Sequence, residues 1–302
     1  MKFGKLADIS GVDFSLPPIN PLNAELLGGK PAESFEAFIG LPRWSSKEWI
    51  DKLYPKGTKP ADFLSYYSRS FNTIELNTTH YRIPNPEQVI KWRDNSDESF
   101  VFCPKIPQII SHYRKLVNVD RELEQFTESI REFGPKYGCS FMQVHESFGP
   151  SHFQNLVDFL VKWPKDLDLA IEFRHADWFE ERSLRPELVR LLTEQGVGTV
   201  ITDVSGRRDV SHNSLSTKFA MIRLVGNSLD PTDFERSDAW LERIDLWVQQ
   251  GLEKLYLFPH EPGDVMAMDL GAYWAKKLNE KFSLKLSIPG IQKMEGDQMS
   301  LF

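Results

Sequence analysis

Short β-type segments alternate with helical segments along most of this 302-residue chain. Eight segments have the apolar, β-branched or alternating composition of strands. They lie at 35–41, 73–79, 100–106, 139–145, 168–175, 197–203, 219–225 and 254–258. Helical patterns lie at 47–70 (in one or two pieces), 86–95, 120–137, 151–162, 186–195, 237–250 and 265–281. Eight strands that mostly alternate with helices over about 250 residues predict an α/β fold, a single-domain (β/α)8 TIM barrel.

A doubly wound open sheet is the alternative α/β fold. No glycine-rich dinucleotide or phosphate loop follows any predicted strand, which disfavours that fold and predicts that no nucleotide cofactor is bound. Outside the barrel (35–282), the proline- and glycine-bearing residues 1–34 predict an irregular arm, either packed on the body or partly disordered. Residues 283–302 form a short polar C-terminal tail.

The composition bounds the partners and the compartment. The chain has 36 basic and 43 acidic residues and a net charge of -7, so it lacks the electrostatic footprint of a non-specific nucleic-acid binder. The net charge does not exclude a local basic groove. Two cysteines, Cys103 and Cys139, suit a reducing cytosol rather than a disulfide scaffold. We expect a cytoplasmic protein with no signal peptide and no membrane span.

The fifth predicted strand carries opposite charges on one face. Leu169, Ile171 and Phe173 form its apolar set, whereas Glu172 and Arg174 share the other face. In a closed sheet that second face points into the interior, where charges are unfavourable unless they are paired or used. The two charges therefore form either a structural ion pair or part of a functional site.

Polar side chains also follow nearly every other predicted strand, at the end where TIM-barrel chemistry takes place. Paired carboxylates suit general acid–base work, so we predict Glu75, Glu172 and Asp203 as catalytic residues. Arginine forks suit carboxylate or phosphate groups, which predicts an anionic small molecule or phosphoester as substrate. The predicted substrate-binding residues are Asn77, Tyr81, Arg82, Lys105, His112, Gln143, Arg174, His175, Arg223 and His260.

Structural roles for some of these residues stay open. Lys105 could extend to the rim, His112 could be a surface histidine, and Asp203 could cap a helix. A divalent metal is also an open alternative, although no ligand pair has a strong metal-binding spacing and nearby arginines would compete with a cation. Its candidate ligands are Glu75, Glu172, Asp203, His175 and His260.

Several of these residues lie in motifs that resemble the DUF72 (YecE-like) family. The motifs are FNTIELNTTHYR at 71–82 and EFRH at 172–175, and Lys105, Gln143 and Arg223 continue the likeness. The resemblance covers about residues 36–282 and implies a TIM barrel with a site at the strand ends. It implies no reaction, because the activity of the family is unknown.

The chain departs from the family pattern at the ends of four strands. The departures are Leu41-Pro42-Arg43 after the first strand, His145 after the fourth, Val225 at the seventh and Pro259-His260 at the eighth. Because they gather at the proposed mouth of the barrel, they predict a pocket that differs from the common one or is degenerate.

The last five residues of the sequence, QMSLF at 298–302, resemble the bacterial sliding-clamp-binding pentapeptide. A polar tail of this kind can bury Leu301 and Phe302 in a hydrophobic groove while Gln298 anchors it by hydrogen bonds. The alternative is a tail whose Leu301 and Phe302 pack back onto the barrel.

Three classes of function follow from these patterns. The first is a DNA-associated enzyme that acts on phosphodiesters and is tethered to a sliding clamp, for which the endonuclease IV barrel gives a fold-level analogy. The second is an isomerase or hydrolase of metabolism that acts on an anionic or sugar-like small molecule. The third is a barrel that binds a ligand or partner without catalysis.

Overall fold

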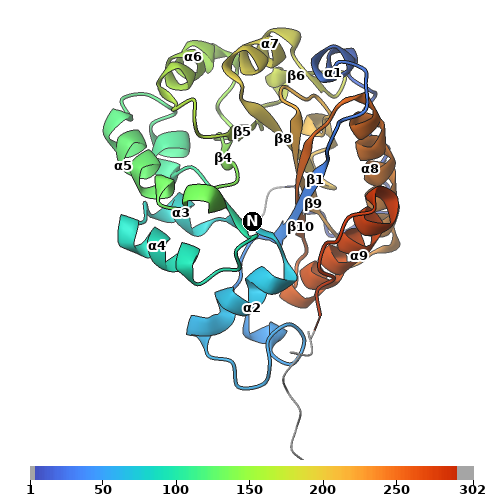
Figure 1. Ribbon diagram of the computed structural model, residues 1–302. Helices are drawn as coiled ribbons and strands as arrows, with labels where there is room; N and C mark the ends of the chain where they lie inside the picture. Colours follow the sequence, from blue (N-terminus) through green and yellow to red (C-terminus); the bar gives the residue numbers. More distant parts are fainter. Residues whose placement is uncertain (1–3, 291–302) are drawn as a thin grey trace, which may run out of the picture.

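The computed structural model describes residues 4–290, and these residues form a barrel of eight parallel strands (Figure 1). Its strands are β1 (Glu36–Leu41), β2 (Thr73–Leu76), β3 (Val101–Pro104), β4 (Ser140–Gln143), β5 (Leu169–Glu172), β8 (Gly198–Asp203), β9 (Phe219–Val225) and β10 (Lys254–His260). They are hydrogen-bonded in the order β3-β2-β1-β10-β9-β8-β5-β4. Isolated pairs, Lys105 with Phe141 and Phe102 with Tyr137, join β3 to β4. The predicted α/β barrel is confirmed.

Helices surround the strands as a ring (Figure 1). They are α1 (Pro21–Leu27), α2 (Phe63–Ser70), α3 (Thr78–Tyr81), α4 (Pro86–Asp94), α5 (Asp120–Arg131), α6 (Phe153–Lys162), α7 (Pro186–Gln195), α8 (Pro231–Gln250) and α9 (Asp264–Phe282). A two-stranded hairpin of β6 (Phe179–Glu180) and β7 (Ser183–Leu184) follows β5. Within residues 4–290, none of these helices combines the length and the apolar character needed to cross a bilayer.

The N-terminal arm supplies a helix that the barrel itself lacks. Residues 204–218, between β8 and β9, contain a short 3-10 turn and no α-helix. Helix α1 lies in this place in the ring, between α7 and α8 (Figure 1), and packs against α8. The sequence predicted an irregular arm because a seven-residue helix between prolines and glycines has little periodicity of its own.

Buried asparagines hold α1 against the loop that precedes β9. Asn20 Nδ2 donates to Ser214 Oγ at 2.8 Å. Asn23 Nδ2 donates to the Asn213 carbonyl at 2.8 Å, and Asn23 Oδ1 accepts from the Leu215 N–H at 2.9 Å. These bonds satisfy polar groups of a buried loop that has no regular partner.

Local sequence signals set several helix ends. Helix α8 begins at Pro231, ahead of the predicted 237, because the Asp230 side chain accepts from the Thr232 N–H and caps the helix. Helix α5 ends at Arg131 rather than 137, since a 3-10 turn at Gly134–Lys136 replaces its last predicted turn. The sequence therefore predicted the positions of the strands more accurately than the ends of the helices.

Strand residues alternate between the barrel interior and the surrounding helices. An apolar layer fills the interior and consists of Cys103, Cys139, Phe141, Ala170, Val200, Met221, Tyr256 and Phe258. Two residues further along the strands, the interior positions become polar at Lys105, Gln143, Glu172, Thr202 and Arg223, with Glu75 paired in register with Cys103. This change from apolar to charged occurs at the C-terminal ends of the strands.

Candidate functional site

A buried network of opposite charges lies at the C-terminal end of the barrel interior. Arg223 on β9 forms two bonds to Glu75 on β2, from Nε to Oε2 at 2.8 Å and from Nη2 to Oε1 at 3.0 Å. Its Nη1 donates to Oε2 of Glu172 on β5 at 2.7 Å. Glu172 Oε1 accepts from Arg174 Nε at 2.6 Å. All four side chains are buried, so the barrel joins strands that are distant in the sequence into one ionic unit.

The guanidinium groups keep both carboxylates charged. Burial alone would raise the pKa of Glu75, but Arg223 and His260 hold it well below its usual range. Burial opposes ionisation of Glu172 in the same way, yet Arg174 and Arg223 hold its pKa at about 2. A buried carboxyl group with several hydrogen-bonded counter-charges stays ionised. Both carboxylates therefore position arginines at neutral pH and do not carry protons.

A pocket of about 420 Å³ opens at this end of the barrel. The predicted residues that line it are Glu75, Asn77, Tyr81, Arg174, Arg223 and His260. Lys5, Arg43, Thr202, Glu261 and Asp264 also line it and were not predicted. A volume of this size suits a small molecule.

His260 links the charge network to the pocket. Its Nε2 lies 2.8 Å from Glu75 Oε2, and its side chain is 18% exposed. Because a carboxylate only accepts hydrogen bonds, Nε2 carries a proton and Nδ1 is the nitrogen that can accept one. Asn77 Nδ2 donates to Glu75 Oε1 at 2.8 Å and so fixes the carboxylate from its other oxygen. The Glu75 carboxylate therefore orients the His260 ring at the edge of the pocket.

Glu261 is a second ionisable group of the pocket, and it was not among the predicted site residues although it follows the eighth predicted strand. Burial, and then the neighbouring Asp233, raise the pKa of Glu261 to about 7. Its Oε2 accepts from the Ser228 N–H at 2.9 Å. A Cβ at Gly226 would lie 2.0 Å from Glu261 Oε1, so a side chain at position 226 would displace the carboxyl group. Its place directly after His260 was the available signal.

Lys105 and Gln143 lie beside the network but do not line the pocket. Lys105 Nζ donates to Gln143 Oε1 at 3.2 Å, and both side chains are buried. Burial, followed by the charge of Arg223, lowers the pKa of Lys105 to about 8. The amine is therefore much closer to neutrality than an exposed lysine is.

Three histidines form a row next to Lys105. The ring centroids of His80 and His112 are 4.9 Å apart, and those of His112 and His145 are 5.6 Å apart. Burial lowers the pKa of His80 to about 4, with Lys105 adding to the effect. Burial and His80 lower that of His112 to the same value, so both rings are neutral at pH 7. His112 is not among the residues that line the pocket.

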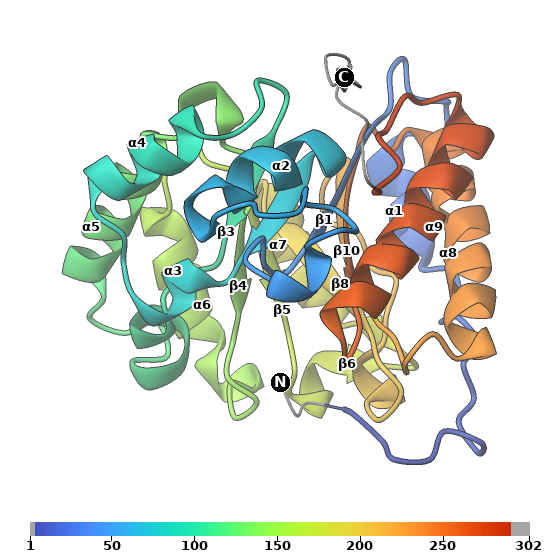
Figure 2. The ribbon, with the colours of Figure 1, turned by 90° about the horizontal axis from the view of Figure 1, so that it is seen from below.

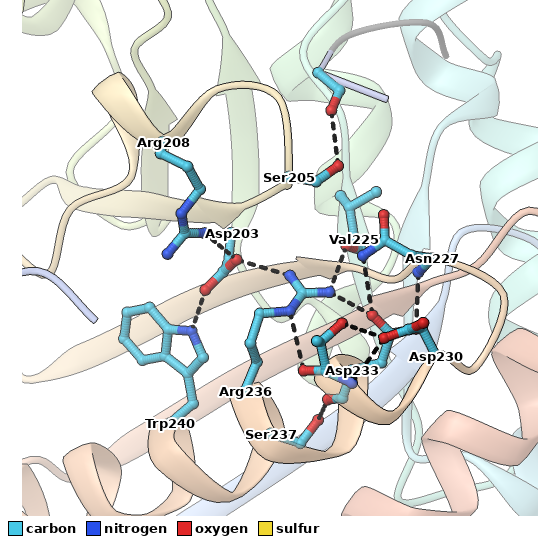
Figure 3. Close-up of polar contacts among 12 residues, drawn as sticks. Asp203, Ser205, Arg208, Val225, Asn227, Asp230, Asp233, Arg236, Ser237 and Trp240 are labelled. Atoms are coloured by element: carbon cyan, nitrogen blue, oxygen red, sulfur yellow. Dashed lines mark hydrogen bonds and ion pairs between the residues drawn. The ribbon is translucent and has the colours of Figure 1, made fainter. Parts of the chain in front are cut away.

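Asp203 does not join the other carboxylates, and that part of the prediction was wrong. Its neighbour Thr202 faces the pocket, so Asp203 points outward to α8. There Asp203 Oδ1 accepts from Arg208 Nη1 at 2.5 Å and Arg236 Nη1 at 2.8 Å, and Oδ2 accepts from Trp240 Nε1 at 2.7 Å (Figure 3). Burial opposes its charge, but Arg236 and Arg208 lower its pKa. Asp203 is a structural anchor.

Three other predicted residues lie at the rim or outside the pocket. Tyr81 lines the pocket and is 73% exposed. Arg82 lines a separate depression beside α4. His175 Nδ1 accepts from the Asp177 N–H at 3.2 Å and caps a short turn, and it is not part of the lining. The predicted partner-binding residues Gln298, Leu301 and Phe302 lie outside the described residues.

The described side chains are not arranged as a metal centre. Across residues 4–290, no group of three His, Cys, Asp or Glu side chains is placed to hold an ion. The oxygens of Glu75 and Glu172 already accept from arginine, histidine and asparagine donors. A cation would have to displace these donors and leave arginines buried without partners.

A larger cavity, of about 910 Å³, lies at the opposite face of the barrel. It is lined by the first residues of β1 and β10 and by residues 284–287 after α9. The N-terminal face of such barrels serves stability, whereas catalytic residues gather at the C-terminal face. We therefore place the candidate site at the smaller pocket, where the charge network and His260 meet.

Together these features define an α/β barrel with a charged pocket at the C-terminal ends of its strands. The chain belongs to the DUF72 family, described as "Protein of unknown function DUF72", which matches residues 38–293. The resemblance seen in the sequence is confirmed.

Similar proteins agree with this assignment. The UPF0759 protein YecE of Escherichia coli strain K12 is 30% identical over 251 residues, covering 77% of this chain and 89% of that protein. The UPF0759 protein YunF of Bacillus subtilis strain 168 is 28% identical over 151 residues, 47% of this chain and 52% of YunF. A crystal structure of a DUF72 family protein from Enterococcus faecalis V583 has a TM-score of 0.63 at 19% identity, covering 81% of this chain and 98% of that one. None of these descriptions states a reaction.

Proposed function

We propose that this protein is an enzyme that binds a small anionic molecule at the C-terminal mouth and transfers a proton to or from it. One observation carries the proposal: His260, oriented by Glu75, lines the same pocket as Arg174 and Arg223. A base and cationic groups in one small pocket are what proton transfer on an anionic substrate requires.

The ionisable groups divide into different roles. Glu75 stays charged and holds His260, whereas the pKa of Glu261 is raised by burial and Asp233 to about 7. A carboxyl group whose pKa is raised toward neutrality can hold a proton and donate it at neutral pH. His260 is the proposed base and Glu261 the proposed acid. Isomerisation or hydrolysis of a phosphorylated or carboxylated small molecule fits this pair.

Exchange of hydrogen with solvent tests proton transfer at carbon, which is the isomerase form of the proposal, and does not require the product to be identified. The protein is incubated in D2O with a panel of phosphorylated sugars and small 2-hydroxy and 2-oxo acids, and proton NMR follows the loss of carbon-bound hydrogen. We expect exchange on at least one compound, loss of this exchange in His260→Gln, and unchanged exchange in His152→Gln, a histidine outside the pocket lining. Exchange that persists in His260→Gln would refute the assignment.

The QMSLF segment motivates a second proposal, that the protein is tethered to a bacterial sliding clamp. A linear motif that buries a Leu-Phe pair in a groove binds independently of the barrel pocket. The test is a fluorescence titration of the full chain against the clamp, with a Leu301→Ala/Phe302→Ala variant and Lys293→Ala as control. Micromolar binding by the wild type and the control, lost in the double variant, would support the tether and make phosphodiesters the next substrates to try. Equal binding by all three proteins, or none, would contradict it.

A further inference from the structure

The N-terminal arm reaches the candidate pocket. We call residues 4–20, which lead into α1, the strap. Figure 2 shows the strap running from α1 along the edge of the barrel to the C-terminal ends of the strands. Lys5 of the strap lines the pocket. The strap lies outside the family match at 38–293, so one residue of the pocket lining comes from outside the matched barrel.

Two arginines anchor the middle of the strap. Both guanidinium groups lie over the Phe14 ring. The distance from Cζ to the ring centroid is 4.7 Å for Arg236 and 5.5 Å for Arg208. Arg208 Nη2 also donates to the Ser15 carbonyl at 3.1 Å. Both arginines are bound by Asp203, as Figure 3 shows. Asp203, which points away from the pocket, therefore positions the two arginines that anchor the strap.

The end of the strap is docked through a close contact between two glycines. The Gly206 N–H donates to the Gly4 carbonyl at 2.7 Å, and Ser205 Oγ donates to the same oxygen at 3.2 Å. A Cβ at Gly206 would lie 2.7 Å from that carbonyl oxygen. Gly4 itself has φ +67°, a conformation that favours glycine. Docking therefore fixes the backbone that carries Lys5.

Within the part of the chain that the structure describes, Lys5 differs from the other cations of the pocket in having no counter-charge. Arg174 and Arg223 are bound to Glu172 and Glu75, and Arg43 lies 3.7 Å from Asp264. No carboxylate among residues 4–290 lies within ion-pair distance of Lys5. A positive charge held at a pocket wall without a partner is suited to bind an anionic group of a ligand.

We propose that the strap is a specificity device: it holds Lys5 at the pocket wall so that ligands with two anionic groups bind better than ligands with one. This inference rests on the proposed binding of anions in the pocket. One anionic group contacts the arginines at the barrel end, and the second contacts Lys5.

Calorimetric titration of the full chain with inorganic phosphate and inorganic pyrophosphate tests the proposal. We expect the wild type to bind pyrophosphate more tightly. Lys5→Met should weaken pyrophosphate about tenfold, as expected for a lost charge-assisted contact, and phosphate much less. Gly206→Ala should have the same effect, because its Cβ displaces the strap while Lys5 is retained. Gly11→Ala is the control, since a Cβ there meets nothing within 4 Å.

The outcomes separate the two proposals. If the wild type binds pyrophosphate and Lys5→Met binds both probes as the wild type does, the strap proposal fails and anion binding stands. If Lys5→Met weakens both probes equally, Lys5 contributes only general charge and the specificity role is refuted. If the wild type binds neither probe, anion binding fails and the strap proposal fails with it. Lys5 is exposed, so its variant should fold normally whatever Gly206→Ala does.

Discussion

Replacing Lys105 with methionine should stabilise the protein at neutral pH, although it removes a buried hydrogen bond. Glu75 and Glu172 carry two negative charges, and Arg174 and Arg223 carry two positive charges, so the network is balanced without the lysine. A protonated Lys105 leaves one excess positive charge in the interior, where its side chain is buried. Unbalanced buried charge is unfavourable because water is excluded.

The magnitude follows from the shifted ionisation. Burial and the charge of Arg223 lower the pKa of Lys105 from 10.5 to about 8, which at 1.36 kcal/mol per pH unit corresponds to about 3 kcal/mol. Below pH 8 the folded state carries this full penalty. Between pH 8 and 10.5 folding releases a proton, so the stability of the wild type rises with pH. Loss of the bond to Gln143 offsets about 1 kcal/mol, which leaves a gain of about 2 kcal/mol at pH 7.

Urea unfolding of the wild type and Lys105→Met at several values between pH 7 and 10.5 measures this difference. The advantage of the variant should be largest near pH 7 and should disappear as pH rises through the 8 to 10.5 range. Lys52→Met, at an exposed position, should show no comparable change. A variant that is less stable than the wild type by the same amount at every pH would refute the reasoning and make Lys105 a required counter-charge.

Three further changes test other parts of the structure. Arg223→Gln should destabilise the protein by about 3–5 kcal/mol at pH 7, because two buried carboxylates would lose a counter-charge. The loss of stability should be smaller at acidic pH, where the carboxylates become protonated. A midpoint of urea unfolding equal to that of the wild type would contradict this prediction. Gly40→Ala should lower the melting temperature strongly, since its Cβ would lie 2.1 Å from a β2 carbonyl, whereas Gly11→Ala should not. Cys103 and Cys139 are buried and burial raises the pKa of both thiols, so a thiol reagent at pH 8 should react with them only after unfolding, and rapid labelling of the native protein would be evidence against the packing.

Much of the fold was predictable because strand patterns are local. All eight barrel strands coincide with predicted segments, since alternation and β-branched runs depend on near neighbours. The polar interior was predictable for the same reason: Glu172 and Arg174 share a strand face whatever surrounds them. Helix α1 was not predicted, because its stability comes from Asn20 and Asn23 bonding to a loop almost 200 residues away in the sequence.

The sequence by itself determined the barrel class, the end of the barrel that carries polar residues, and the residue types gathered there. Only the tertiary structure decided which of them meet. Arg223 and Glu75 are separated by 148 residues, and nothing local indicates that they pair. Thr202 and Asp203 are adjacent, yet one lines the pocket and the other faces α8, because a shift of one position along a strand reverses the face of the sheet. Lys5 reaches the pocket only because distant anchors hold the strap, and such contacts depend on the folded arrangement of the whole chain.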